Sequence, residues 1–340
     1  MTDELSPRRR TIMGLVIREY IASGIPVGSR AILDRYELGV SPATIRNEMA
    51  ALEELGFLTH PHTSAGRVPT EEGYRFFVEH LLGDMTLPSE ERLLIRHQFG
   101  QARAEMDQWV KLAAAVLAHT VRNVALATAP KAVNSRIKRV ELIEIRDGIV
   151  LLVLVTMEGS VKQQMLNLPL LQDDLHRVTN ELNEQLTGRT AAEMRAQNPL
   201  LSPWAADVAN ILVPIMDRLD SRVSDIYREG LSHALAEPEF AEGDMIRRVV
   251  EIIEARPLLE SIVAKTRESD GVQVIIGGEG RWRELSNVSL VLSRYGVDDD
   301  TTGVLGVLGP LRMPYGRTIS AVRYVSTLMS ELLREFYGQT

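Results

Sequence analysis

The residues best suited to chemistry lie between 41 and 58, where their spacing predicts a helix that offers hydrogen-bonding groups to a partner. Ser41 is a preferred helix N-cap and Pro42 suits the first helical position, while Gly56 suits the left-handed residue that ends a helix. Apolar side chains at spacings of three and four predict one buried stripe: Ile45, Met49, Leu52 and Leu55. Ala43 and Asn47 point away from that stripe, and Thr44 and Arg46 lie on its flanks. Together with Ser41, these small or hydrogen-bonding side chains could approach a base-pair edge.

Two of these side chains match the edges of particular bases. Asn47 could pair bidentately with adenine, and Arg46 could pair with guanine or hold a phosphate. The pattern leaves both roles of Arg46 open. Thr44 would also reach base edges, and Ser41 or Ala43 would allow the close approach. The hypothesis is a recognition helix in the major groove of DNA.

The residues after this helix predict a short hairpin that could hold the DNA backbone. Strand-like runs at 57–59 and 67–69 flank the polar loop 60–66. Such a hairpin can lie along phosphates or enter a minor groove. His60 and His62 in the loop do not complete a metal site, because two imidazoles are too few ligands. We expect contacts with the DNA backbone from the hairpin and from three arginines near the N-terminus: Thr63, Ser64, Arg67, Arg8, Arg9 and Arg10.

The elements that must position these residues follow a familiar order. Ser6-Pro7 predicts a first helix that closes near Gly24, Ser29 a cap for a short helix at 30–36, and Thr70 a cap for a fourth helix. Helix, helix, turn, helix, hairpin, helix is the order of a winged helix-turn-helix. The alternative is a small helical packing domain that holds no DNA. Residues 1–80 contain 9 Arg, no Lys and 11 Asp and Glu, so any attraction for phosphates must come from local clusters.

Several runs resemble HrcA, a family of bacterial heat-inducible transcription repressors. The specific block comprises PVGSR (26–30), SPATIRNEMAALEELGFL (41–58) and HPHTSAGRVPTEEGYR (60–75), and looser matches are YREGLSHALAEPEF (227–240) and GVLGVLGPLRMPYGRTISAVRYVSTLM (303–329). Because the matches extend from 26 to 329, the resemblance covers the whole chain. It implies a dimer that binds an inverted-repeat operator upstream of chaperone operons, releases it on heat shock and needs a chaperonin for activity. It also implies a GAF-like domain split by an inserted dimerisation domain.

Composition limits the classes of protein that this chain can belong to. Its 340 residues suffice for two or three domains, and 45% hydrophobic with 25% charged residues is typical of a globular protein. The absence of cysteine excludes disulfides and fits a cytoplasmic protein. No apolar leader follows Met1, and apolar runs such as 149–156 are too short to span a bilayer. The net charge of −8 favours a focused DNA contact over general polyanion binding.

Periodicity along the chain predicts an α+β, multidomain fold. The expected domains are a winged helix-turn-helix at 1–83, a GAF-like antiparallel sheet domain at 89–169 and 268–340, and an inserted, mainly helical dimerisation domain at 170–267. A heptad over 89–120 indicates one long helix, packed either on another helix or on a sheet. The expected strands are 124–128, 140–145, 149–156, 161–168, 272–276, 289–293 and 303–308. The other expected helices are 173–186, 191–196, 203–235 with a kink or break at Pro214, 244–255 and 319–336.

Nothing in the sequence favours catalysis. Gly277-Gly278-Glu279-Gly280 lacks the Lys-Ser/Thr ending of a P-loop, and we interpret it as a turn after a strand. Asp298-Asp299-Asp300 lacks the ligand spacing of a calcium loop. No nucleophile elbow, zinc-protease motif or kinase motif occurs. We therefore expect no enzyme, no cofactor and no metal.

Two functions remain. The first is a heat-shock repressor of chaperone operons, as the family resemblance implies. The second is a metabolite-responsive winged-helix repressor whose GAF-like domain holds a small effector. A pocket with convergent polar groups would favour the second function, and a core filled by side chains would count against it.

Overall fold

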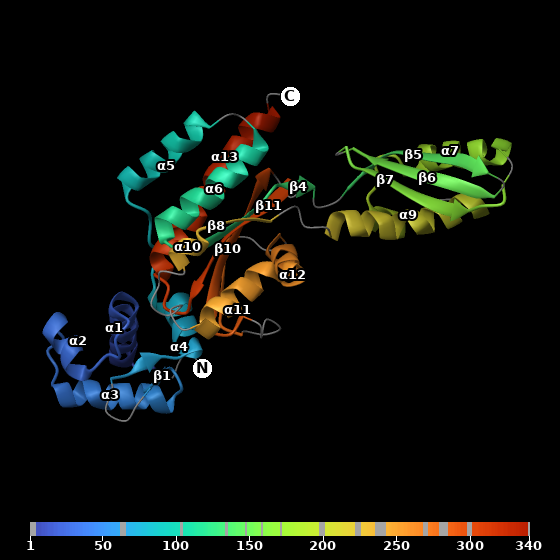
Figure 1. Cartoon of the computed structure of the whole chain (residues 1–340). Coiled ribbons are helices and arrows are strands. Elements are labelled where there is room, and N and C mark those ends of the chain that lie inside the picture. Colours follow the sequence, from blue (N-terminus) through green and yellow to red (C-terminus); the bar gives the residue numbers. More distant parts are fainter. Residues whose placement is uncertain are drawn as a thin grey trace. The chain divides into compact units, whose positions relative to one another are not determined.

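The computed structural model describes residues 5–61, 66–102, 105–132, 135–146, 148–157, 159–170, 172–196, 201–221, 226–234, 243–267, 271–278, 285–297 and 301–338. They form an α+β protein with two compact units (Figure 1). Unit 1 comprises Met1–Ala129, Asp225–Gly296 and Gly303–Thr340, and unit 2 comprises Pro130–Ser224 and Val297–Thr302. Among the described helices, none is both long enough and apolar enough to cross a membrane.

The N-terminal module of unit 1, residues 7–81, contains the element order predicted from the sequence. Ser6 Oγ accepts a hydrogen bond from Arg9 N (3.3 Å), and Thr70 Oγ1 accepts one from Gly73 N (3.0 Å), so both predicted caps are confirmed. Ser29 instead begins its helix, and Gly28 holds the N-cap position without a side-chain hydrogen bond. The elements are α1 (Pro7–Ser23), α2 (Ser29–Arg35), α3 (Pro42–Glu54), β1 (Leu58–Thr59), β2 (Val68–Pro69), α4 (Glu71–Phe76) and the π-helix η2 (Phe77–Leu81).

The single helix expected at 89–120 is wrong, because the chain forms two helices there. These are α5 (Ser89–Gln101) and α6 (Met106–Val121). Ala102 and Glu105 between them have extended backbones, and Gly100 weakens the end of α5. The predicted seam is nevertheless buried on both sides of the break, at Ile95, Phe99, Trp109, Ala113 and Val116.

One antiparallel sheet forms the centre of unit 1. Its strand order is β8-β3-β11-β10-β9, and β4 also pairs with the start of β11. The strands are β3 (Val124–Thr128), β4 (Lys131–Ala132), β8 (Ile226–Glu229), β9 (Val272–Ile276), β10 (Val288–Val297) and β11 (Thr301–Pro310). Helix α13 (Tyr315–Gly338) lies beside α6, which packs on β3 (Figure 1). Two further helices pack on each other, α11 (Gly243–Glu254) and α12 (Arg256–Arg267), and the second was not expected.

The prediction of one helix over 203–235 is also wrong, because the helix ends at Ser221. Helix α9 (Pro203–Ser221) continues through Pro214, because Leu212, Ile215 and Met216 around it are buried in the core of unit 2. The chain then forms β8, which pairs with β3, and the short helix α10 (Leu231–Ala234). A local apolar period cannot reveal a short strand whose partner is a hundred residues away.

Unit 2 has its own core between a three-stranded sheet and helices. The sheet order is β5-β6-β7, from β5 (Ile137–Arg146), β6 (Ile149–Thr156) and β7 (Val161–Asn167). Burial alternates strictly along β6, and the buried side faces α7 (Gln172–Leu186), α8 (Ala191–Ala196) and α9. The other side of the sheet carries large apolar side chains that are about half exposed: Ile143, Ile145, Val161 and Met165.

Unit 2, with Pro130–Ser224 and Val297–Thr302, has other bounds than the inserted domain expected from the sequence at 170–267. Strands β5 to β7 pair only with one another, so they join α7 to α9 rather than the sheet of unit 1. Thr128 at the end of β3 and Ile226 at the start of β8 are register partners. Unit 2 thus occupies the connection of a β-hairpin. The strands at 140–168, which were expected from the sequence in one domain with those at 272–308, lie in unit 2, and hydrophobic alternation predicts strands without predicting their partners.

Candidate nucleic-acid interface

The start of α3 is held in a fixed geometry by its cap. Ser41 Oγ accepts a hydrogen bond from Thr44 N (3.1 Å) and lies 3.0 Å from Thr44 Oγ1. Both hydroxyl groups are therefore engaged with each other, and Thr44 is half-buried. Ile45, one residue further on, is fully buried with Met49 and Leu52. This burial fixes which side of α3 faces outward.

The outward side carries Ala43 and Asn47, as the helical period predicted, together with Arg46, which the period placed on the flank of the apolar stripe. All three are exposed. Neither Arg46 nor Asn47 makes a side-chain hydrogen bond or ion pair with another described residue. The donors of Arg46 and the amide of Asn47 are thus available for a partner, beside a small residue that permits close approach.

The arginines near the N-terminus differ in their surroundings. Arg8 is exposed and has no partner among the described residues. Arg9 Nε lies 2.9 Å from Glu48 Oε2 of α3, and Arg10 is half-buried. Of the expected cluster, Arg8 therefore keeps its full charge at the surface, whereas the charge of Arg9 is largely neutralised.

At the base of the β1–β2 hairpin, Arg67 is held by both its backbone and its side chain. Its N and O form hydrogen bonds of 2.9 Å with Val27 O and N, and its Nε lies 2.9 Å from Glu53 Oε2. His60 Nδ1 contacts the other oxygen of Glu53. Thr63, Ser64 and His62, which were also considered in the sequence, lie outside the described residues.

Sequence reasoning missed Glu48 and Glu53, the carboxylates that pair with these arginines. Both lie on the half-buried flank of α3. The only signal in the sequence was the excess of acidic residues over arginine in residues 1–80. That excess does not say which arginine is neutralised.

A second set of contacts connects the N-terminal module to the sheet of unit 1. Arg312 Nη1 donates to Ile21 O (2.7 Å), and Arg75 Nη2 donates to Ile276 O (3.4 Å). The carboxylate of Glu71 lies so close to Gly277 that an added Cβ would be 2.1 Å from it. Gly277 has φ +63° and donates its N–H to Val288 O (2.9 Å), so the described part of the glycine run forms a turn against the chain's own carboxylate.

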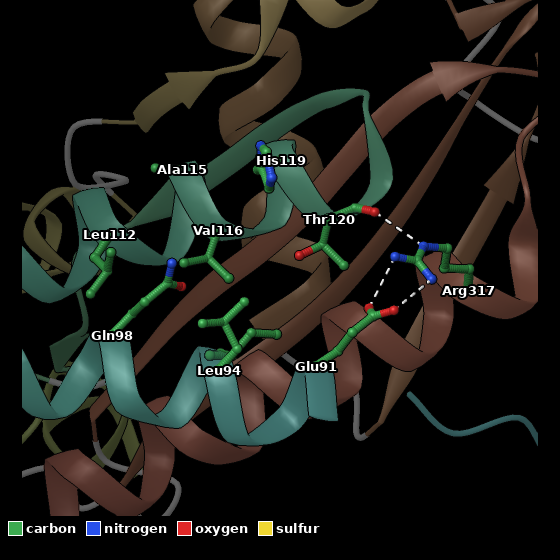
Figure 2. A pocket seen from close by; sticks show the side chains of 10 residues that line it. Glu91, Leu94, Gln98, Leu112, Ala115, Val116, His119, Thr120 and Arg317 are labelled. Carbon is green, nitrogen blue, oxygen red and sulfur yellow. Dashed lines mark hydrogen bonds and ion pairs between the residues drawn. The ribbon is translucent and has the colours of Figure 1, made fainter. Parts of the chain in front are cut away.

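A groove of about 350 Å³ lies between α5 and α6 (Figure 2). Leu94 and Val116 are among the apolar side chains that line it. At one end Arg317 Nη2 lies 3.0 Å from Glu91 Oε2, and its Nε donates to Thr120 O (3.1 Å). The charged groups Arg317 and Glu91 therefore bind each other at this end, and the polar side chains of Gln98 and His119 also line the groove.

Some polar groups buried beside the sheet of unit 1 form hydrogen bonds with one another or with the backbone. Tyr295 Oη donates to Thr128 O (2.6 Å), and Ser289 Oγ lies 2.7 Å from Tyr315 Oη. Burial raises the pKa of Tyr315 well above its usual value, so its hydroxyl stays neutral. These pairs belong to a packed core.

Comparison with known proteins identifies the family. The model of the HrcA protein C-terminal domain matches residues 107–319. The heat-inducible transcription repressor HrcA of Roseiflexus castenholzii is 46% identical over 349 residues, covering 99% of this chain and 97% of that protein. The chain belongs to the HrcA family.

Further comparisons agree with this assignment. HrcA of Herpetosiphon aurantiacus is 46% identical over 99% of this chain and 97% of its own length, and HrcA of Dehalococcoides mccartyi is 36% identical over 98% of both. A crystal structure described only as a hypothetical protein superimposes with a TM-score of 0.61 at 25% identity, covering 98% of this chain and 99% of that chain. This member of the HrcA family is thus a heat-inducible transcription repressor and not an enzyme.

Proposed function

We propose that this repressor binds an inverted-repeat operator upstream of chaperone operons, with its N-terminal module acting as a winged helix-turn-helix. Helix α3 would enter the major groove, and the β1–β2 hairpin would be the wing. The name of the relatives, heat-inducible transcription repressor, supports binding to DNA and release of the DNA on heating. The residues that make the contact are our own assignment.

The assignment rests on one observation, which is that the side chains of Arg46 and Asn47 are available to a partner. They are exposed next to the capped start of α3, and neither is paired with another described residue. Asn47 would bind an adenine edge, and Arg46 a guanine edge or a phosphate. Ser41, Ala43 and Thr44 would lie against the duplex at the same end of the helix. Arg8 and Arg67 would bind phosphates, with Arg9, Arg10, Thr63 and Ser64 as further backbone contacts.

We infer that the repressor acts as a homodimer whose contacts lie in unit 2. An inverted repeat has two-fold symmetry, and one module reads only a half-site. The half-exposed apolar side chains on the open side of the β5-β6-β7 sheet support this inference, because a single copy leaves them facing water. In this scheme unit 2 is the inserted dimerisation domain, and the sheet of unit 1 is the GAF-like domain.

The remaining partner in the proposal is the chaperonin, in the cytoplasm. The family resemblance suggests it, and the fold gives a reason. Strand β3 (Val124–Thr128) pairs with β11 (Thr301–Pro310). The sheet of unit 1 can therefore form completely only after the whole chain between these two strands has been synthesised. Such nonlocal pairing is slow and leaves apolar strands open in partly folded chains.

Binding titrations of Arg46→Ala and Asn47→Ala against the repressor's own chaperone promoters test the assignment. Each substitution should weaken operator binding by about 1–3 kcal/mol and relax specificity at one position of each half-site. Arg334→Ala is the matched control, because Arg334 is an exposed arginine on α13, outside the N-terminal module. If both variants bind like the parent at equal salt, α3 does not read the operator.

A further inference from the structure

The hairpin is fastened to α3 by one carboxylate that holds both of its sides. His60 follows β1 and Arg67 precedes β2, so the two residues stand at opposite ends of the loop. Glu53 Oε1 contacts His60 Nδ1, and Glu53 Oε2 accepts from Arg67 Nε at 2.9 Å. A single side chain of the proposed recognition helix thus connects to both strands of the proposed wing.

The backbone at this place is independently fixed. Val27 and Arg67 form a bridge with two hydrogen bonds of 2.9 Å. Gly66 packs so tightly that an added Cβ would lie 2.5 Å from the carbonyl carbon of Val27. The position of the Arg67 backbone is therefore set by Val27. Glu53 in turn fixes the direction in which the guanidinium group of Arg67 points.

Among the described residues, Glu53 is the side chain that the guanidinium group of Arg67 contacts, and this contact leaves donors for another partner. Arginine has five N–H donors in a rigid fork, and only Nε is used by Glu53. The side chains of Arg67 and Glu53 are 19% and 25% exposed, so solvent screens the pair only in part. A phosphate could bind the terminal nitrogens of Arg67 while Glu53 holds Nε.

We propose that Glu53 is a positioning residue of the DNA interface, which fixes the wing in one orientation through Arg67 and His60 and keeps Arg67 partly neutralised. This rests on the proposed function of α3 and the hairpin. A carboxylate at this place repels the phosphates of any duplex, whereas the fixed wing favours only the correct one. Glu53 therefore lowers affinity for random DNA and raises the preference for the operator.

Glu53→Gln tests this with Glu54→Gln as the matched control. Glu54 is the next residue of α3, is exposed and has no partner among the described residues, so the control removes the same charge without freeing a cation. Binding to operator and to random duplex is measured over a series of salt concentrations. For Glu53→Gln, binding to random duplex should strengthen and its salt slope should steepen by up to about 0.9 per freed cation. The operator-to-random ratio should fall about tenfold, as expected for the loss of a charged hydrogen bond.

Two further variants separate positioning from general charge. Glu53→Asp keeps the charge but withdraws the carboxylate from both Arg67 and His60, so the operator-to-random ratio should fall while the salt slope changes less. In a background carrying Arg67→Ala and His60→Ala, Glu53→Gln should have no further effect on the ratio, because its two partners are gone. Thermal melting of each variant shows whether the module stays folded.

The results that overturn the proposal are distinct from those that overturn the function. If Glu53→Gln and Glu53→Asp keep the parent's operator-to-random ratio while Arg46→Ala loses operator binding, α3 reads DNA but Glu53 does not position the wing. The proposal is also rejected if Glu53→Gln changes the operator-to-random ratio equally in the parent and in the background that carries Arg67→Ala and His60→Ala. If Arg46→Ala and Asn47→Ala bind like the parent, the proposed interface itself is wrong.

Discussion

Within the N-terminal module, ion pairs decide which arginines are available to a polyanion. Arg9 and Arg67 are each bound by a carboxylate of α3, while Arg8 and Arg46 have no such partner among the described residues. A module with more acidic than basic residues can therefore still present arginines at its surface that no described carboxylate binds. The electrostatic attraction is local, and net charge is a poor guide to it.

Gly66, at the base of the wing, packs tightly against the backbone of Pro26 and Val27. A Cβ there would meet the backbone of Pro26 and Val27 at 2.5–2.6 Å, and backbone atoms cannot move aside as a flexible side chain can. Gly66→Ala should therefore destabilise the module by about 1–3 kcal/mol and weaken operator binding, because the Val27–Arg67 bridge must open. Gly28→Ala is the control, since nothing lies within 4 Å of its added Cβ. Equal melting temperatures for the two variants would show that the bridge is not a constraint.

Between elements, the free edge of β5 in unit 2 is closed by a side chain of α7. Asn183 Oδ1 accepts from Val140 N (2.9 Å), and its Nδ2 donates to Val140 O (2.8 Å). The amide thus imitates a neighbouring strand at the edge of the sheet. Because Asn183 also donates to Thr179 O (2.9 Å) of its own helix, it ties α7 and β5 together.

Replacing this amide should loosen the edge. Asn183→Ala leaves the N–H and C=O of Val140 without that partner, so the free energy of unfolding of unit 2 should fall by about 1–3 kcal/mol. Gln185→Ala removes an exposed amide from the same helix and should change the melting temperature little. Calorimetry of both variants, with the transition of unit 2 assigned by hydrogen exchange at β5, decides the matter. Identical transitions would contradict the role given to Asn183.

Prediction from the sequence succeeded where the determinants are local. The strands Val124–Thr128, Ile149–Thr156 and Val272–Ile276 are apolar runs bounded by breakers, and the structure places them at those residues. The cap at Ser41 and the exposure of Arg46 and Asn47 likewise follow from one helix and its period. Some missed features are local, such as the break between Gln101 and Met106, and others are tertiary. The strand at Ile226–Glu229 exists because β3 lies beside it, and Glu53 meets Arg67 only when the hairpin folds onto α3.

For the whole molecule, the position of unit 2 in a hairpin connection allows a clean test of dimerisation. Thr128 and Ile226 are paired across β3 and β8, so residues 129–225 can be replaced by a two-residue Asn-Gly turn. If unit 2 holds the dimer together, the shortened repressor should be a monomer by light scattering and should bind a half-site with the affinity of one module. A dimer that persists would place the interface in unit 1, where Leu93 and Leu94 of α5 are 68% and 60% exposed.

The same topology bears on how heat could act. In unit 2 the strands β5, β6 and β7 are consecutive and form a meander, so the apolar run Ile149–Thr156 finds its partners early. In unit 1, Val124–Leu126 must instead wait for Gly306–Leu308 of β11. Until then β3 has no partner on that edge, and its side chains, all buried in the native state, stay open to other chains. A chaperonin would bind the partly folded chain in which β3 has not yet paired with β11. On heating, other unfolded proteins would occupy the chaperonin, so fewer repressor molecules would finish folding.

Following operator binding through the heat-shock temperature range, with and without chaperonin, tests this account. Repressor diluted from denaturant should regain operator binding slowly and incompletely, and chaperonin with its nucleotide should raise the yield several-fold. Repressor that is already folded should keep its binding over the same range, because the pairing of β3 with β11 has been made. The shortened repressor with the Asn-Gly turn is the control, since it brings β3 and β8 together locally and should need less help. If folded dimer loses the operator reversibly at the shock temperature and chaperonin makes no difference, heat acts on the repressor directly and the chaperonin is not its sensor.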